Sequence, residues 1–455
     1  MAAKRDLVEA QSFSRRRLLT AFVSGAPGGQ ELEPTKPMRG VVAGIMLSVL
    51  VVIGSLAWGA LRSDPKDWSN NRLVVVSGEG TRYLALGGEL FPVVNTTSAR
   101  LGVPAGQFEV VQLARRVIDD APLRETVGIV GAPDSPPAAA SLVTTGWTSC
   151  VAPDGLATSL GTGPGSPATG TATGTATQGS AAPSDDRAVV ATSAGRTFVV
   201  THGARHLVPD DEVSGVLRAI GLDTVAPVEV PAAWLHLFPE GSDLAPLEVA
   251  GAGRPAPADS PLRDLDVGTV VRVSGTGTAD RWYVVDRRGQ LAVLSEFATA
   301  LYRAPAGVQE VTRSLADLQD AQTATTAVAP EDWPATPVEA LEPGAAPCAV
   351  LTTGDDEHVA LVAAPQPPAA GVHVVPGGGA LVVGRAAAAG PGVHALVDET
   401  GRRFALPTAD QGDDDVLVRL GYSADLVTPV PAAWLDLFAP GPDLTTDAAL
   451  TPVVP

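Results

Sequence analysis

The longest uninterrupted apolar stretch of the chain runs from Gly40 to Leu61, and its 22 residues include no charged side chain. A helix of that length rises about 33 Å at 1.5 Å per residue, close to the roughly 30 Å of hydrocarbon in a bilayer. The pattern therefore predicts a single transmembrane helix at 40–61.

Charges on either side of this stretch predict its orientation. Seven basic residues precede it, whereas Arg62 and Lys66 after it alternate with Asp64 and Asp67. Because basic residues stay preferentially on the cytosolic side, we expect a single-pass protein of the inner (plasma) membrane with a cytosolic N-terminus and a large extracytoplasmic region. A cleaved signal peptide is the alternative, but 39 residues precede an apolar stretch that is longer than a usual signal core.

The segment before the span combines basic and apolar side chains at helical spacing. Residues 10–23 are expected to form a short helix whose apolar side includes Val23. This surface could dock on a partner protein or on the inner leaflet of the membrane. The predicted docking residues are Arg15, Arg16, Arg17, Leu18, Leu19 and Phe22.

After the span, two short apolar runs flank a Gly-containing turn at four places, which is the pattern of a β-hairpin. These places are residues 82–93, 197–209, 282–294 and 394–407. Helical spacing follows the last three, at residues 211–220, 295–304 and 413–420. The pattern predicts four hairpin-plus-helix repeats.

The second and fourth repeats also share a longer match. Residues 230–238 read VPAAWLHLF and residues 430–438 read VPAAWLDLF, which indicates duplication. We expect Trp234 and Trp434 to be equivalent buried anchors of these repeats. Pro231 and Pro431 are expected in the first turn of a helix.

The repeats are unevenly spaced, which argues against a tandem solenoid. We expect an α+β extracytoplasmic region in which four hairpin-plus-helix repeats surround a central β-rich domain, elongated and with pseudo-two-fold symmetry. A Gly/Thr-rich insertion without large apolar residues is expected to be flexible. The expected boundaries are a cytosolic basic tail at 1–39, the transmembrane helix at 40–61, a stalk at 62–79, repeats at 80–115, 188–250, 280–330 and 392–455, central-domain parts at 116–160, 251–279 and 331–391, and the flexible insertion at 161–187.

Charge and cysteine content refine this picture. Residues 1–61 hold 7 Lys and Arg against 4 Asp and Glu, a net +3, and the remainder holds 24 against 46, a net −22. An acidic outer region disfavours nucleic acid as a partner.

Cys150 and Cys348 both lie in that outer region, where an oxidising compartment favours one disulfide over two buried free thiols.

The residue patterns assign no catalytic, cofactor-binding or metal-binding residue, and no cofactor is expected. A P-loop needs a Gly-Lys pair, which the chain lacks. His202 and His206 flank a hairpin turn and are expected in solvent rather than on a metal. The acidic run 410–415 lacks the residue order of a Ca²⁺ loop and is expected to be an exposed helix start. Glycoside cleavage needs only a pair of carboxylates, and some pairs are unavoidable among so many acidic residues, so the sequence leaves enzymatic activity open. A non-catalytic role is favoured.

Several motifs resemble EccB, the membrane component of actinobacterial type VII (ESX) secretion systems. They are residues 11–19 (QSFSRRRLL), 91–101 (FPVVNTTSARL), 128–133 (GIVGAP) and 147–150 (WTSC), with the ends of the two large repeats at 241–244 and 441–444. The resemblance covers nearly the whole chain, and the run at 91–101 is its most specific part. The Gly/Thr-rich insertion, Thr96 and Val130 depart from the family pattern without affecting the expected fold.

The resemblance implies a periplasm-facing scaffold that supports protein export in an oligomeric complex with other ESX membrane components. It further implies peptidoglycan contact, because family repeats are similar to cell-wall-binding modules. Two alternatives are an ATP-binding hydrolase, since family members are often labelled ATPases, and a stand-alone peptidoglycan-binding module.

Overall fold

The computed structural model describes most of the chain, which divides into two compact units at residues 1–67 and 68–455. The described residues are 4–24, 37–61, 67–161, 186–275, 278–305, 307–366, 368–385, 392–407 and 416–453. The Gly/Thr-rich insertion, apart from its ends, and the acidic run 410–415 lie outside these residues.

The first unit consists of two helices, α1 (Lys4–Ser24) and α2 (Pro37–Leu61). Helix α1 is longer than the predicted segment 10–23, and the described side chains along it are exposed. Among the described residues, no helix meets the combined requirement of length and apolarity for a membrane span.

The described residues of the second unit form five β-sheets, and four of these sheets share one topology. Three consecutive strands form an antiparallel meander, a helix follows, and a last strand returns to pair in parallel with the first. We call each such sheet with its helix a module and number the modules in chain order.

The modules consist of the following elements. Module 1 contains β1 (Arg72–Val76), β2 (Arg82–Leu86), β3 (Glu89–Pro92), α3 (Thr96–Leu101) and β4 (Glu109–Leu113). Module 2 contains β7 (Arg187–Ser193), β8 (Arg196–Thr201), β9 (Ala204–Val208), α4 (Val213–Ala219) and β10 (Val228–Glu229), with β15 (Glu339–Ala340) added beside β7. Module 3 contains β11 (Val270–Gly275), β12 (Thr278–Val285), β13 (Leu291–Leu294), α6 (Glu296–Arg303) and β14 (Glu310–Arg313). Module 4 contains β19 (Ala380–Arg385), β20 (Val393–Val397), β21 (Arg402–Ala405), α7 (Val416–Leu420), β22 (Thr428–Pro431) and β23 (Ala439–Pro440).

In each module the hairpin read from the sequence is the pair formed by the second and third strands. The first strand lies upstream, so β1, β11 and β19 fall before residues 80, 280 and 392, where the expected repeats begin. These strands are short apolar runs such as RLVVV, in which neighbouring residues on both faces are buried. A run buried on both faces has no period-two alternation, and the sequence pattern therefore did not mark it.

The fifth sheet is the central one, with strand order β17-β16-β5-β6-β18. Its strands are β5 (Trp147–Ala152), β6 (Gly155–Leu160), β16 (Ala346–Thr352), β17 (His358–Ala364) and β18 (Gly371–Val374). Strands β5 and β16 are antiparallel neighbours although almost 200 residues separate them in the chain. The predicted disulfide is confirmed, because Cys150 lies directly opposite Cys348 and the two are bonded.

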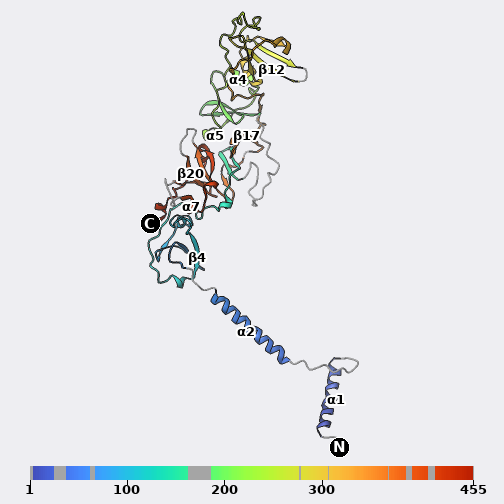
Figure 1. The fold of residues 1–455 in the computed structure, drawn as a ribbon, viewed down its shortest axis with the longest axis vertical. Coiled ribbons are helices and arrows are strands. Elements are labelled where there is room, and N and C mark those ends of the chain that lie inside the picture. The colour runs from blue at the N-terminus through green and yellow to red at the C-terminus, as the bar shows by residue number, and fades with distance from the viewer. Residues whose placement is uncertain are drawn as a thin grey trace. The chain divides into compact units, whose positions relative to one another are not determined.

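The hydrophobic cores connect these sheets. One core combines the inner faces of the central sheet with side chains of modules 2 and 4, and a second joins modules 2 and 3 around α4 and α6. A third joins α3 of module 1 to α7 of module 4 and α9 (Thr446–Leu450) near the C-terminus. Figure 1 shows β4, α7, β20, β17, α4 and β12 following one another along the second unit. The remaining short helices are α5 (Ala232–Leu235), α8 (Ala432–Leu435), η1 (Arg115–Val117), η2 (Ala139–Ser141), η3 (Leu315–Leu318) and η4 (Ala424–Leu426).

Candidate functional site

The two duplicated tryptophans lie against the central sheet. Trp234 lies within α5 and Trp434 lies at the same position within α8. Both side chains are fully buried. The indole Nε1 of Trp234 donates a 3.0 Å hydrogen bond to the carbonyl oxygen of Ser149 on β5. Pro231 and Pro431 directly precede these helices as N-cap residues rather than lying in their first turn.

The aromatic contacts of the two repeats differ. The ring of Trp234 meets that of Phe238 at 5.0 Å between centroids, in an edge-to-face arrangement. Phe438 instead meets Trp147 of β5 at 5.7 Å, also edge to face. Both duplicated segments thus reach the disulfide-bearing strand, one through a hydrogen bond and the other through a ring contact.

Modules 1 and 4 are joined by a reciprocal pair of arginines. The guanidinium of Arg100 in α3 donates to the carbonyl oxygen of Leu420 at the end of α7, at 3.1 Å. The guanidinium of Arg419 in α7 donates to the carbonyl oxygens of Leu101 and Val103 at the end of α3, at 3.0 and 2.8 Å. Each arginine satisfies carbonyls that the last turn of a helix leaves free, and each places positive charge at the negative end of the other helix. No local pattern in the sequence indicates that these two residues, more than 300 positions apart, meet.

His206 contradicts the expectation of a solvated turn. It lies on β9 with its side chain fully buried, and its Nδ1 donates to the carbonyl oxygen of Ser242 at 2.8 Å. Burial lowers the pKa of His206, while the Ser242 carbonyl and the nearby Asp332 carboxylate partly offset this effect. The ring also lies against Gly241, where an added Cβ would come within 2.5 Å of Cε1.

Asp332 completes this cluster from a loop that follows module 3. Its Oδ2 accepts a 2.6 Å hydrogen bond from the backbone N–H of Ser242. Partial burial raises the pKa of Asp332, but the hydrogen bonds from Ser242 outweigh it and the pKa is lowered overall. The cluster joins module 2 to the chain segment after module 3. Within the parts of the chain that the structure describes, no group of three or more His, Cys, Asp or Glu side chains is arranged to hold a metal ion.

The predicted docking residues of the tail all lie on α1. Arg15, Arg17, Leu18, Leu19 and Phe22 are exposed, and the side chain of Phe22 is 93% accessible. Arg16 lies on the same helix and is also exposed. An exposed apolar and basic surface of this kind is typical of segments that bind another surface.

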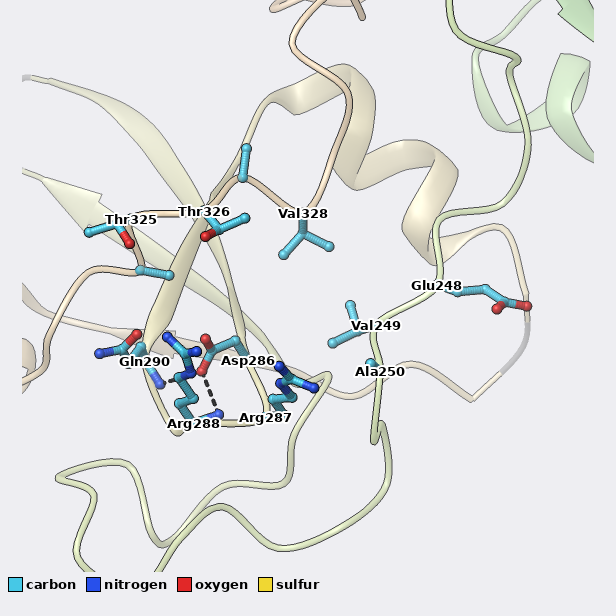
Figure 2. A pocket seen from close by; sticks show the side chains of 12 residues that line it. Glu248, Val249, Ala250, Asp286, Arg287, Arg288, Gln290, Thr325, Thr326 and Val328 are labelled. Carbon is cyan, nitrogen blue, oxygen red and sulfur yellow. Dashed lines mark hydrogen bonds between the residues drawn. The ribbon is translucent and has the colours of Figure 1, made fainter.

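A hollow of about 300 Å³ lies beside the turn between β12 and β13 (Figure 2). Arg287 and Arg288 of that turn form one side, Thr325 and Thr326 form the facing side, and Val249 and Val328 lie to one side of both pairs. The oxygen Oδ1 of Asp286 accepts hydrogen bonds from the backbone N–H groups of Arg288 and Gln290, both at 2.8 Å. The sequence pattern predicts this hairpin at 282–294, but it does not distinguish the two adjacent arginines from other exposed turn residues.

Comparison with known proteins places the whole chain in one family. The family model described as "Type VII secretion system ESX-1, transport TM domain B" matches residues 1–453. The chain therefore belongs to the EccB family of type VII secretion, as its sequence motifs predicted.

Curated relatives and solved structures agree with this assignment. The chain is 29% identical to the ESX-3 secretion system ATPase EccB3 of Mycobacterium tuberculosis, over 90% of this chain and 82% of the relative. It is 26% identical to EccB3 of Mycolicibacterium smegmatis, over 90% and 83% of the two chains. A structure of an EccB3 dimer from the ESX-3 core complex matches with a TM-score of 0.64 and 24% identity, covering 83% of this chain and 99% of that one. A chain of an intact ESX-5 inner membrane complex matches with a TM-score of 0.65 and 21% identity, covering 100% and 96%.

Proposed function

We propose that this protein is a structural core component of a type VII (ESX) secretion membrane complex. The observation that carries the proposal is the family match over residues 1–453, which includes both units of the chain. Two solved chains with this fold come from ESX-5 inner membrane complex structures, one of them described as the periplasmic assembly. The second unit, residues 68–455, would then be the ectodomain, a scaffold in the periplasm that supports protein export.

The anchor in this proposal is the stretch 40–61, which crosses the inner membrane once with the N-terminus in the cytosol. Its uncharged sequence and the excess of basic residues before it support this topology. Protease added to spheroplasts should then remove the ectodomain and leave a short N-terminal fragment. Full protection of the ectodomain would contradict the proposed orientation.

We further propose that the extracytoplasmic region consists of four related modules with pseudo-two-fold symmetry, in which modules 2 and 4 flank the central sheet and carry modules 3 and 1, respectively. The shared strand order of the four sheets and the reciprocal contacts of Arg100 and Arg419 support this organisation. Under this proposal each module begins at the first strand of its sheet, near residues 72, 187, 270 and 380.

The tail would recruit the protein into its complex through α1. Deleting residues 1–37 while keeping 40–61 should abolish co-purification with other ESX membrane components and stop export of an ESX substrate. The Cys150–Cys348 disulfide should still form in the deleted protein, because the ectodomain folds as a separate compact unit. Persistent export without the tail would exclude a recruiting role.

Substitutions can separate the basic and the apolar contributions of α1. Replacing Arg15, Arg16 and Arg17 by Gln removes three positive charges, and replacing them by Lys keeps the charges as a matched control. If charge drives docking, the Gln variant should lose its partners and the Lys variant should retain them. Replacing Leu18, Leu19 and Phe22 by Ala tests the apolar surface in the same assay.

ATP hydrolysis is the competing function, because relatives such as EccB3 of Mycobacterium tuberculosis are named ATPases. The chain has no Gly-Lys pair for a P-loop, and its three lysines all lie at or before residue 66. Purified full-length protein in detergent micelles should release no more phosphate from ATP than a heat-treated sample. Turnover that disappears on a single ectodomain substitution would favour the enzyme over the scaffold.

A further inference from the structure

The turn between the second and third strands of module 3 packs differently from the corresponding turns of modules 2 and 4. In module 4 this turn is Asp398–Arg402, and Oδ1 of Asp398 accepts from the backbone N–H groups of Thr400 and Arg402 at 3.1 and 3.0 Å. Asp286 makes the same pair of bonds in module 3, so the two turns are equivalent. Glu399 and Thr400 of module 4 therefore correspond to Arg287 and Arg288 of module 3.

In modules 2 and 4 this turn is covered by an outer strand of the central sheet. A Cβ at Gly401 would come within 2.5 Å of the Val372 side chain on β18, and a Cβ at Gly203 would come within 2.5 Å of the Val359 carbonyl oxygen on β17. The carboxylate of Glu399 also accepts a 2.6 Å hydrogen bond from the backbone N–H of Gly377. Each turn thus contacts a polypeptide strand.

In module 3 the corresponding turn borders the hollow instead. Gly289 packs closely on Ser260 behind the turn, while Arg287 and Arg288 are exposed on the other side. Neither arginine forms an ion pair with any residue that the structure describes. The region after residue 61 carries a net charge of −22. Two adjacent arginines without a carboxylate partner therefore form a local positive site on an acidic region.

The hollow has the chemistry to bind carboxylates. Guanidinium groups bind carboxylates through paired, charge-assisted hydrogen bonds, and the hydroxyls of Thr325 and Thr326 face them as further donors. The Oδ1 atom of Asp286 is occupied by the turn, and Figure 2 shows the Glu248 side chain directed away from the other lining side chains. Val249 and Val328 add an apolar surface at one side of the hollow, next to the polar side chains.

We propose that this hollow binds a short acidic polypeptide segment in an extended conformation. The carboxylates of the segment pair with Arg287 and Arg288, and an apolar side chain between them packs on Val249 and Val328. The covered turns of modules 2 and 4 favour a polypeptide over other anions, because each already contacts a strand. A volume of about 300 Å³ is at the small end of ligand pockets and suits a few residues. The inference does not depend on the proposed role in secretion.

The variant Arg287→Glu/Arg288→Thr tests this proposal by giving module 3 the residues of the module 4 turn. The probe is a fluorescently labelled hexapeptide of alternating Asp and Val, measured by anisotropy with full-length protein in detergent micelles. The wild type should bind it, and the variant should bind roughly tenfold or more weakly because two charged contacts are lost or reversed. Added salt should weaken wild-type binding, since the arginines are exposed.

A charge-matched control is available from one arginine of module 3 and one that precedes this module in the chain. Arg263 and Arg281 are exposed and do not line the hollow, so Arg281→Glu/Arg263→Thr changes the net charge equally and should leave peptide binding unchanged. The turn variant keeps Asp286 and Gly289 and should gain affinity for a hexapeptide of alternating Lys and Val. That gain would demonstrate that its module is folded.

Two results would overturn the proposal. One is equal binding of the acidic peptide by the wild type and the turn variant. The other is failure of the wild type to bind the acidic peptide. If inorganic phosphate binds in that case, the hollow belongs to a small oxyanion and not to a polypeptide.

Discussion

The indole Nε1 of Trp234 donates a 3.0 Å hydrogen bond to the carbonyl oxygen of Ser149, the residue next to the disulfide-bonded Cys150. Trp434 is equally buried, but its Nε1 has no hydrogen-bond partner among the described residues. Two duplicated segments thus bury the same side chain against the same core, and only one of them satisfies the indole N–H.

This difference predicts unequal effects of replacing the two tryptophans by Phe. Both replacements remove similar apolar volume, but Trp234→Phe also leaves the Ser149 carbonyl without its donor. Trp234→Phe should therefore reduce the free energy of unfolding by about 1 kcal/mol more than Trp434→Phe. Urea unfolding followed by circular dichroism measures the difference, and equal losses would contradict the assigned role of the hydrogen bond.

The disulfide should stabilise the central sheet strongly. Cys150 and Cys348 are 198 residues apart, and closing a loop of that length restricts the unfolded chain by roughly 5 kcal/mol in the chain-entropy model. Replacing both cysteines by Ala should lower the unfolding midpoint by several degrees or more, and reduction of the wild type should reproduce the shift. Alkylation of the denatured, unreduced protein should label no thiol. Labelling of two thiols would contradict the bond.

Arg100 and Arg419 should couple modules 1 and 4. A hydrogen bond from a charged donor contributes about 1.5–3 kcal/mol, and each arginine donates to carbonyls of the opposite module. Arg419→Ala should cost about 2 kcal/mol, and a double-mutant cycle with Arg100→Ala should reveal coupling because both act at one interface. Hydrogen exchange at the ends of α3 and α7 should increase in either variant. The exposed Arg281→Ala is the control and should change neither measurement.

The sequence predicted the elements that have local patterns. The four hairpins occur at residues 82–93, 197–209, 282–294 and 394–407. Helix α6 (Glu296–Arg303) lies within the predicted segment 295–304, and its N-cap Ser295 accepts a hydrogen bond from the Ala298 N–H. The pairing of Cys150 with Cys348 followed from their count and compartment. The residues of the tail surface were visible in the sequence, and their docking role remains a proposal.

Contacts between distant segments left no comparable signal. Strand β18 lies in a Pro- and Gly-rich region that carries no strand pattern of its own. It forms by parallel pairing with β6, which lies more than 200 residues earlier. His206 was expected in solvent because the sequence places it beside a hairpin turn. The residues that bury it, 240–243 and Asp332, lie farther along the chain. Burial that depends on loops packing together cannot be read from the periodicity of one strand.

The buried His206 should make the stability of module 2 depend on pH. Its pKa is lowered in the folded protein, chiefly by burial, so the unfolded chain takes up a proton at a higher pH than the folded one. The titratable groups that face the ring are Asp332, Asp243 and His202. Protonation would also place an N–H donor at Nε2, which is buried without a partner among the described residues, and this opposes the charged form as burial does. Stability from the neutral ring is present above the unfolded pKa of about 6.5 and decreases as the pH falls below it towards the folded pKa.

The unfolding midpoint of the wild type should therefore fall between about pH 7.5 and 5.5, and His206→Gln should reduce this dependence. His358 is exposed on β17, so His358→Gln serves as the matched control and should retain the wild-type slope. The His206→Gln variant should be less stable than the wild type at pH 7.5, because the hydrogen bond to Ser242 is disturbed. The difference in unfolding midpoint between this variant and the wild type should become smaller towards pH 5.5. Parallel pH profiles for the wild type and His206→Gln would mean that the buried imidazole does not control the acid sensitivity of this module.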